Sequence, residues 1–390
     1  MRRLAPPACA LLALSGCGGG HGTTQVAATL VPPGTSSYLR IRTSQLPRAV
    51  GVLARFPARD TALLQLPAVP RGAGPELDVA TLAGGRVFFT QPSDPKAFDT
   101  RLDATGRVHA RLLGWTVFAR RLDLLDAVRH RRGNLAAEAW FAAASRTLPA
   151  EAAVRELTRG WRATALTLTD GDAELVVHRL RPPVLDSSSV LAAAVPPDAI
   201  VAAGVAAPGN VPAGTPTLLR ALAATVDGPL VGWVRAGRDL PEVTVVATPA
   251  DLRRALRETG RFVARLTKNP AAVAVTVDGA KLFDVSNGAI DVYYGLVRGR
   301  LVLSDSGAAA ASAGSTGKSL AAWSQLPGAT ESWTYLNVPT GLPLAHAYAG
   351  LFDLVVPPAL EMRLAPLREV LHYESHDGRV ATTVTRVALR

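Results

Sequence analysis

The chain has 390 residues, of which 48% are hydrophobic and 19% are charged, and this composition excludes a largely disordered protein. The length is sufficient for two domains of ordinary size. The formal net charge of +11 is compatible with anionic lipid headgroups or a nucleic acid. However, the arginines are scattered along the chain without interleaved aromatic residues, so we expect a dispersed surface charge and no nucleic acid partner.

The first residues have the pattern of a bacterial lipoprotein signal. Arg2-Arg3 precedes an apolar run over 4–14, which is shorter than the roughly 20 residues that span a bilayer. The small pair Ser15-Gly16 leads directly to Cys17. The resemblance to lipoprotein precursors implies cleavage before Cys17 and lipidation of its thiol, and two acyl chains would anchor the protein stably. An ordinary secretory signal with a chance cysteine is the alternative interpretation.

Cysteine usage agrees with the lipoprotein interpretation. The chain has two cysteines, Cys9 within the signal and Cys17 at its end. The folded part therefore has no thiol, disulfide or cysteine metal ligand, which suits a compartment outside the membrane. We expect a signal peptide over 1–16, a flexible tether over 17–30, and a lipid-anchored protein at the extracytoplasmic face of the cell membrane.

The predicted elements after the tether occur twice, in the same order. The first element of each copy is a strand behind a proline pair. Pro32-Pro33 precedes the run 35–41, and Pro196-Pro197 precedes the run 199–205. Such self-similarity predicts an internal repeat.

The second element of each copy is a strand that enters a capped helix. Residues 87–94 have this pattern in the first copy, and residues 244–251 have it in the second. In the second copy we expect Thr248 to be the N-cap, Pro249 to occupy the first helical position and Asp251 to lie in the first turn.

The third element gives the closest match between the copies. A strand at 114–119 leads to Leu135-Ala136-Ala137, and a strand at 299–304 leads to Leu320-Ala321-Ala322 with the same spacing. A predicted helix follows in each copy and ends at a Leu-Pro pair.

Each copy ends with two strands around an Asp-Gly hairpin turn, Asp170-Gly171 and Asp377-Gly378. The two halves therefore run over 31–185 and 195–390, and the second has an insertion near 272–285 that we expect to form strands. Antiparallel strands mixed with several helices indicate the α+β class. We expect two related repeats, each a mostly antiparallel sheet packed with helices.

This order of blocks resembles a family of actinobacterial envelope proteins known as domain of unknown function 3352. The resemblance is carried by the proline pair with Tyr38-Leu39-Arg40, and by the succession of strand, helix, Leu-Ala-Ala and Leu-Pro in both halves. It covers most of 30–390 and implies an architecture and an envelope location. Many members look anchored through an N-terminal helix, whereas this chain has the Cys17 signal in its place. The resemblance brings no catalytic motif.

Two further motifs resemble known sites but lack essential residues. Residues 314–319 read Gly-Ser-Thr-Gly-Lys-Ser after a strand, but Ser312 stands where a phosphate-binding loop needs its first glycine. Asp170, Asp172 and Glu174 form an acidic group that is too short for a calcium-binding loop. We interpret both segments as turns.

His372 and His376 are spaced like the ligands of a zinc helix, with Glu374 between them and Asp377 after them. A zinc protease motif needs glutamate directly after the first histidine, and Tyr373 is there instead. The repeat places this segment on a strand. We therefore predict no metal, no cofactor and no catalytic residue, although a triad assembled in space would leave no local motif.

A predicted helix from Thr248 to Leu266 is amphipathic, which suits either a core-packed helix with a solvated face or a helix on lipid headgroups. We favour the first interpretation. Its expected apolar face consists of Leu252, Leu256, Val263 and Leu266, and its basic face of Arg253, Arg254, Arg257, Arg261 and Arg265. We expect four tryptophans to anchor the cores of the repeats: Trp115, Trp140, Trp161 and Trp323.

The sequence thus predicts a lipid-anchored envelope protein, attached to the membrane through Cys17, that acts without catalysis as a binding or scaffolding module. Its expected partners are the membrane and either an apolar ligand or another envelope protein. Two alternatives stay open. The protein could carry a lipid or other apolar ligand between its antiparallel sheets and helices, or it could be a hydrolase with a spatially assembled site.

Overall fold

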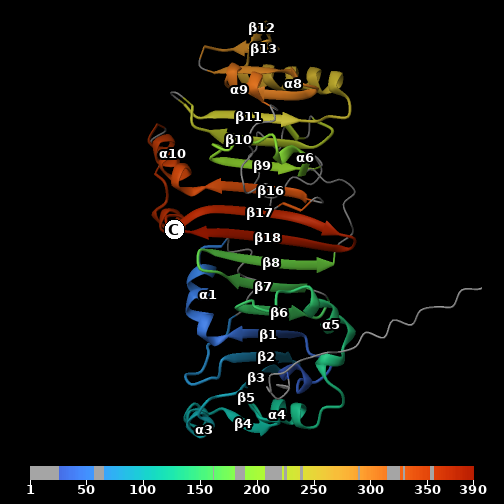
Figure 1. The fold of residues 1–390 in the computed structure, drawn as a ribbon, viewed down its shortest axis with the longest axis vertical. Helices are drawn as coiled ribbons and strands as arrows, with labels where there is room; N and C mark the ends of the chain where they lie inside the picture. Colours follow the sequence, from blue (N-terminus) through green and yellow to red (C-terminus); the bar gives the residue numbers. More distant parts are fainter. Residues whose placement is uncertain are drawn as a thin grey trace, which may run out of the picture.

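The computed structural model is one elongated sheet with helices on both faces (Figure 1). The described residues are 26–56, 66–160, 162–180, 189–206, 222–223, 226–237, 240–288, 290–313, 326–327, 330–351 and 355–390. No helix in these ranges is both long and apolar enough to cross a bilayer.

The sheet has eighteen strands, and neighbouring strands are antiparallel. Their spatial order is β4-β5-β3-β2-β1-β6-β7-β8-β18-β17-β16-β9-β10-β11-β15-β14-β13-β12, from the lower end of Figure 1 to the upper end. The strands up to β8 are β1 (Ser37–Arg42), β2 (Glu76–Leu82), β3 (Gly85–Thr90), β4 (Val108–Leu112), β5 (Trp115–Ala119), β6 (Val154–Thr158), β7 (Arg162–Leu168) and β8 (Asp172–Leu180). The later strands are β9 (Val201–Val205), β10 (Leu230–Arg235), β11 (Glu242–Ala247), β12 (Val273–Val277), β13 (Ala280–Ser286), β14 (Asp291–Val297), β15 (Arg300–Ser304), β16 (Thr330–Asn337), β17 (Leu367–Asp377) and β18 (Val380–Leu389).

Side chains alternate between the two faces of a strand, so each face of this sheet has its own core. We name the face that carries Tyr38 and Trp333 face A, and the face that carries Leu39 and Leu303 face B. The helices packed on face A are η1 (Ala27–Thr29), α4 (Leu122–Arg129), η3 (Leu135–Ala137), α5 (Ala139–Arg146), α6 (Ser189–Ala192) and α9 (Gly307–Ser312). The helices packed on face B are α1 (Leu46–Leu53, directly after η2, Thr43–Gln45), α3 (Pro95–Ala104), α8 (Leu252–Thr267), α10 (Val338–Leu351) and α11 (Pro358–Leu364).

The pairing of β8 with β18 joins the first half of the chain to the second. The two strands align from Asp172 opposite Ala388 to Leu180 opposite Val380. A mixed α+β fold with antiparallel strands agrees with the sequence prediction, but we expected a separate sheet in each half, and the structure has a single one. The reason is that β8 and β18 would each end a half with unpaired backbone groups, and their mutual pairing satisfies these groups.

The centre of the first half contains a buried ion pair on face A. Arg40 Nε donates to Asp78 Oδ1 over 2.8 Å, and the Asp78 side chain is fully buried. Burial is the largest single effect and lowers the pKa of Arg40. The charges of Asp78, Tyr38 and Glu76 and the hydrogen bond to Asp78 together outweigh it, so the pKa of Arg40 is raised. Burial also raises the pKa of Asp78, and Arg40 opposes that rise. In the second half, β9 has the place of β1 in the strand order, and there Gly204 lies opposite Trp333 instead of a charged pair.

Several predicted elements are confirmed. The two Asp-Gly turns join β7 to β8 and β17 to β18. The insertion expected near 272–285 forms the hairpin of β12 and β13. The helix expected after residues 87–94 is α3, and Asp94 caps it by accepting from the Ala97 amide over 3.0 Å.

The predicted start of α8 at Thr248 is wrong. The helix begins at Leu252, and its N-cap is Asp251, which accepts from the Arg254 amide over 2.9 Å. The Thr248 amide instead donates to the Pro229 carbonyl over 2.9 Å, which holds that residue in the chain before the helix. A carboxylate and a hydroxyl both cap well, so tertiary pairing decided between the two candidates.

The flexible tether expected over 17–30 is too long by several residues. Ala27, Ala28 and Leu30 are fully buried in the face A core of the first half. The Leu135 amide donates to the Val31 carbonyl over 2.9 Å, which fixes this segment beside η3. The range 1–25 lies outside the described residues. Small apolar residues followed by leucine can fill a core, and this tertiary role is not visible in the local pattern.

Lowering the pH should destabilise the fold through His178 on β8. Its Nε2 donates to the Thr147 carbonyl over 3.1 Å, and its Nδ1 lies 2.9 Å from Thr382 Oγ1. Burial lowers the pKa of His178, and the Thr147 carbonyl opposes this shift. The unfolded chain therefore binds a proton more readily below a pH of about 6.5, and the free energy of unfolding should fall there. Urea denaturation at two pH values on either side of this point should show a smaller fall for His178→Gln than for the natural chain, and an equal fall would contradict this role.

Removing one partner of the buried ion pair should destabilise the first half strongly. Asp78→Ala leaves the Arg40 guanidinium buried without its carboxylate, and such losses cost about 3–5 kcal/mol. The double variant Arg40→Met with Asp78→Leu should recover most of the loss because it leaves no buried charge. Chemical denaturation of the three chains checks both expectations, and a single variant within about 1 kcal/mol of the natural chain would be evidence against the pair.

Candidate functional site

A cleft in the outer part of the first half is lined by four arginines. It has a volume of about 510 Å³ and lies where the β2–β3 turn, the end of β5 and the start of α4 meet, near the lower end of Figure 1. Arg86 belongs to β3, Arg107 precedes β4, and Arg120 and Arg121 follow β5. Such a concentration of guanidinium groups in one hollow suits an anion.

The four arginines differ in how far their charge is already neutralised. Arg121 Nη2 lies 2.6 Å from Asp123 Oδ2, so its charge is shared. Arg86 is near Glu156, whose pKa is raised by burial and lowered in turn by Arg162 and Arg86. Arg107 and Arg120 have no carboxylate partner within the part of the chain that the structure describes. The cleft therefore keeps a net positive charge.

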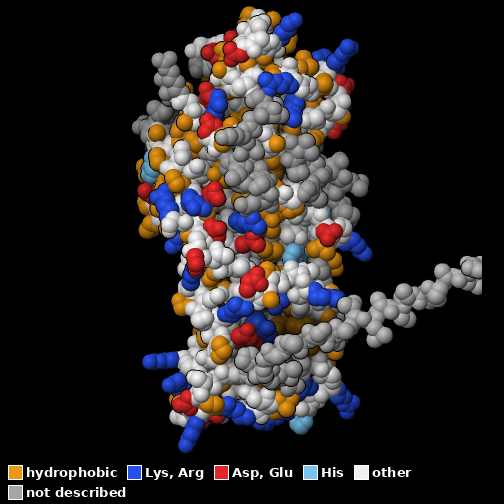
Figure 2. All heavy atoms as spheres, viewed as in Figure 1, with side chains coloured by type: hydrophobic (Ala, Val, Ile, Leu, Met, Phe, Trp, Pro, Cys, Tyr) orange, Lys and Arg blue, Asp and Glu red, His pale blue; other side chains and the backbone are white. Residues whose placement is uncertain are grey.

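Some other arginines of this protein form close ion pairs with carboxylates. Arg40, Arg111 and Arg235 lie 2.8, 2.9 and 2.6 Å from the nearest oxygen of their carboxylate partners. Basic and acidic side chains also mix over the face seen in Figure 2, which agrees with the dispersed charge expected from the sequence. Among the described residues, Arg107 and Arg120 have no such carboxylate partner, a property they share with many other arginines of the chain. The cleft differs in gathering its arginines in one hollow.

Arg107 is held in place by aromatic rings. Its guanidinium carbon lies 5.4 Å from the ring centroid of Phe88 and 6.0 Å from that of Phe118. The two rings stack with centroids 5.0 Å apart and planes 11° apart. Stacking fixes the plane of the guanidinium and leaves its N–H edges free to donate hydrogen bonds. The aromatic pair on β3 and β5 thus orients a donor toward the cleft.

The remaining wall of the cleft is apolar. It includes Phe88, Leu124, Pro67 and Ala68. Gly85 permits the close approach of the β2–β3 turn to α4, because a Cβ there would lie 2.9 Å from a Leu124 methyl carbon. Guanidinium donors beside apolar walls fit a ligand that combines an anionic group with an apolar part.

A second cleft, of about 410 Å³, lies on the seam between the halves. Residues of β7, β8, β17 and β18 line it. Its two arginines, Arg368 and Arg386, are balanced by Asp172, Glu174 and Glu369, and Arg386 directly contacts Glu174. The carboxylates of this cleft outnumber its arginines, so it has no excess of positive charge.

A third cleft, of about 270 Å³, lies between α9 and the proline pair Pro196-Pro197. Arg235 is the charged residue in its lining, and that guanidinium pairs with Glu242. Of the three clefts, the one in the first half is thus the strongest candidate for binding a charged ligand.

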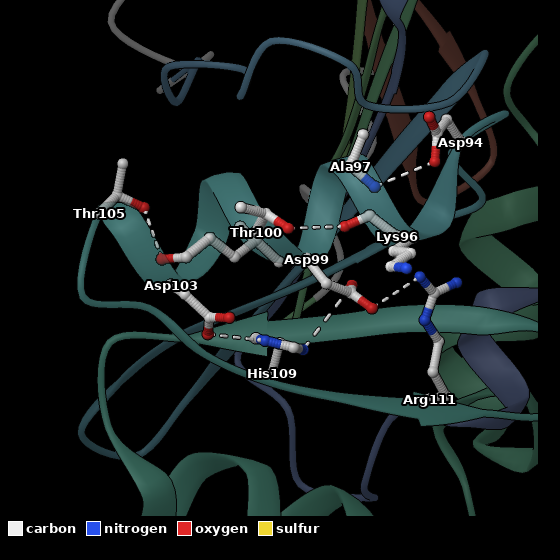
Figure 3. Close-up of polar contacts among 10 residues, drawn as sticks. Asp94, Lys96, Ala97, Asp99, Thr100, Asp103, Thr105, His109 and Arg111 are labelled. Atoms are coloured by element: carbon white, nitrogen blue, oxygen red, sulfur yellow. Dashed lines mark hydrogen bonds and ion pairs between the residues drawn. The ribbon is translucent and has the colours of Figure 1, made fainter.

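A polar cluster at the edge of the first half fastens α3 to β4 (Figure 3). His109 Nε2 lies 3.0 Å from Asp103 Oδ1, and His109 Nδ1 lies 3.7 Å from Asp99 Oδ1. Asp99 also accepts from Arg111 over 2.9 Å. The two aspartates come from the helix and the two basic residues from the strand, so the cluster has a structural explanation.

The lipidation residue predicted from the sequence, Cys17, lies outside the described residues, and so do the glycine-rich segment 314–319 and the run 320–322. The prediction of lipidation stays untested. Of the predicted core tryptophans, Trp115 is buried in the face A core and Trp140 packs against it. Trp161 and Trp323 are also outside the described ranges.

His372 and His376 do not share a site. Both lie on β17, where residues four apart along a strand are separated by about 13 Å. His372 Nδ1 is 2.7 Å from Thr385 Oγ1, whereas His376 contacts Glu331. The side chains of His376 and Glu331 are only 7% and 4% exposed, and neither lines a cleft described above. Within the described ranges, no three acidic, histidine or cysteine side chains gather closely enough to hold a metal ion.

The acidic group around Asp170 belongs to the turn and start of β8, and its Glu174 contacts Arg386 across the seam. On α8, the buried face consists of Ala255, Thr259, Phe262, Val263 and Thr267. Leu266 is 44% exposed, so its place in the expected apolar face is wrong. All five arginines of the predicted basic face are exposed, as a solvated helix face requires.

Sequence reasoning missed the arginine cleft. Its four charged residues come from three places between 86 and 121, and the densest basic run, 129–132, is not part of it. The Gly84-Gly85 turn and the Arg120-Arg121 pair at a strand end were the local signals. Neither signal shows that the two segments meet, because only the pairing of β3 with β5 brings them together.

Comparisons with known proteins add no family and no activity. No protein-family model matches the chain, and no curated protein matches it. Two solved structures, crystal forms I and IV of TP0453, are similar over 71% and 73% of this chain and 90% and 94% of their own, each at 10% identity. Their TM-scores of 0.20 and 0.19 are too low to support an argument about fold or function.

Proposed function

We propose that this chain is a non-enzymatic binding module of the cell envelope, anchored to the membrane by a lipid on Cys17, and that its arginine cleft binds an anionic amphiphile. The ligand class is a molecule with a phosphate or carboxylate group and an apolar tail. The proposal joins the two partners expected from the sequence, the membrane and an apolar ligand.

The observation that carries the binding proposal is the gathering of four arginines in one hollow beside an apolar wall. Two of them, Arg107 and Arg120, have no carboxylate partner among the described residues. An ionised ligand group that accepts from such donors forms hydrogen bonds stronger than those between neutral groups. The Phe88 and Leu124 side chains would contact an apolar tail in the same cleft. The cleft holds no histidine or serine in its lining, and this composition favours binding over nucleophilic catalysis.

We also infer that the two halves are related repeats, with one binding cleft developed in the first. The support is the shared strand order on either side of the seam: β8-β7-β6-β1-β2-β3-β5-β4 and β18-β17-β16-β9-β10-β11-β15-β14. The helices after β3 and β11, α3 and α8, lie on face B, and the helices after β5 and β15, α4 and α9, lie on face A. The two strands paired at the seam, β8 and β18, are each the last strand of their half. Related halves would explain this equivalence.

Arg120→Ala should weaken the binding of dodecyl phosphate about tenfold, since a hydrogen bond to a charged group contributes about 1.5 kcal/mol or more. Arg107→Ala should do the same. Arg253→Ala, on the exposed face of α8, is the matched control because it removes the same charge elsewhere. Isothermal titration calorimetry with dodecyl phosphate measures the effect.

Two further titrations separate the contributions of head and tail. Inorganic phosphate should bind more weakly than dodecyl phosphate, and dodecyl maltoside, which has the tail without the charge, should bind weakly and without dependence on Arg120. If the Arg253→Ala control loses as much affinity as Arg120→Ala, the binding reflects net charge alone and the cleft proposal fails.

Cys17→Ala should move the protein from the membrane fraction to the soluble fraction when it is produced in a bacterium that processes lipoproteins. The physical reason is the loss of the acyl chains that anchor the N-terminus. Fractionation and intact mass of the natural chain check the expectation. A variant that stays wholly with membranes, or a natural chain with an uncleaved and unmodified start, would rule out this anchor without bearing on the arginine cleft.

A further inference from the structure

The two outer edges of the sheet differ in chemistry. β4 forms one edge, and its His109 and Arg111 are tied to the aspartates of α3 (Figure 3). β12 forms the other edge, with the sequence Val-Ala-Val-Thr-Val over 273–277. It contains neither a charge nor a proline, the two devices that commonly protect an edge strand. Among the described residues, β12 pairs with β13 alone.

The hairpin turn fixes which backbone groups of β12 face outward. Asp278 and Gly279 both have positive φ, 48° and 79°, and they form a two-residue turn between Val277 and Ala280. The residues that flank such a turn exchange both of their hydrogen bonds, and hydrogen-bonded pairs then alternate along the strands. Residues 273, 275 and 277 therefore bond to β13. The N–H and C=O groups of Ala274 and Thr276 point away from the sheet and are available to another strand.

The sheet extends further at this end than at the other. In the first half the sheet ends at β4, whereas in the second half β13 pairs with β14, and β12 extends it further. Val273 is 62% exposed at the final edge. An edge of this kind, apolar and with outward backbone donors and acceptors, is suited to strand addition.

We propose that β12 pairs with β12 of a second copy of this chain, antiparallel about a two-fold axis at Val275. In this register Ala274 lies opposite Thr276 of the other copy, so both outward-facing residues of each strand exchange hydrogen bonds. All five residues of the strand overlap, and each valine faces a valine: 275 faces 275, and 273 faces 277. No charged residue opposes another within the paired strands.

The assembly closes at two copies. The other edge, β4, is charged and bound to α3, so it offers no equivalent surface for a third chain. A five-residue pairing is small for a protein interface, so the dimer should form at high protein concentration. Tethering on one membrane would raise the effective concentration of the strands, but the proposal itself concerns the protein in solution and does not depend on the arginine cleft.

Cysteine crosslinking tests both the contact and its register. The test uses the full chain with Cys9→Ser and Cys17→Ser, so that an introduced thiol is the sole one. Val275→Cys places two thiols directly opposite each other in a non-hydrogen-bonded pair, with Cα atoms about 4.5 Å apart, a distance that a disulfide can span. Val273→Cys is the matched control, because its two thiols would be about 13 Å apart in the same dimer. Mild oxidation should give at least about tenfold more covalent dimer for Val275→Cys than for Val273→Cys.

Two measurements without a new thiol complete the test. Sedimentation equilibrium of the Cys9→Ser, Cys17→Ser chain should show a monomer–dimer equilibrium, and a mixture of Val275→Lys and Val275→Asp chains should dimerise more than either alone. Hydrogen exchange at the Ala274 and Thr276 amides should slow as protein concentration rises. Equal crosslinking at both positions would indicate random collision and overturn the proposal. Protection of these amides that is independent of concentration would show that another segment of the same chain covers the edge, and this would overturn it as well.

Discussion

The hydrogen-bonded pairing of β8 with β18 is the interaction on which the rest of this architecture depends. It merges the strands of both halves into one sheet. Among the described strands, this sheet ends at β4 and at β12, far apart along the long axis (Figure 1). His178 reinforces the seam, since it contacts Thr382 on β18 and the Thr147 carbonyl beyond α5 in the first half. Without the seam, each half would expose a long unpaired strand.

The two halves use a similar strand order around different central chemistry. In the first half, Arg40 and Asp78 meet at the centre of face A and neutralise each other. In the second half, Gly204 takes the central position, and a Cβ there would lie 2.5 Å from the Trp333 indole, so glycine leaves room for the ring. The centre of face A is thus filled by an ion pair in the first half and by a packed indole ring in the second. The strand order is the same on both sides of the seam despite this difference, whereas the outer ends of the two halves differ.

The features that we connect with function lie at the two outer ends of the sheet, near β4 and at β12. The first half ends in a charged edge beside the arginine cleft, and the second ends in the neutral β12 hairpin. Among the described residues, no carboxylate pairs with Arg107 or Arg120, although acidic residues are plentiful elsewhere in the chain. An unpaired guanidinium is costly to bury and useful at an open cleft, where water solvates it until an anion replaces the water.

Local sequence determined much of this protein. The Asp-Gly turns, the strand periodicity, the Asp94 helix cap and the inserted hairpin follow from interactions between residues close in the chain, and each was predictable for that reason. The signal around Cys17 is likewise a local pattern, and it predicts an anchor that lies outside the described residues. The tertiary structure alone decided that β8 meets β18, that Ala27 and Leu30 belong to a core, and that Arg107 and Arg120 share one cleft. These outcomes depend on contacts between segments far apart in sequence, and the pattern of a single segment does not specify which partner it will meet.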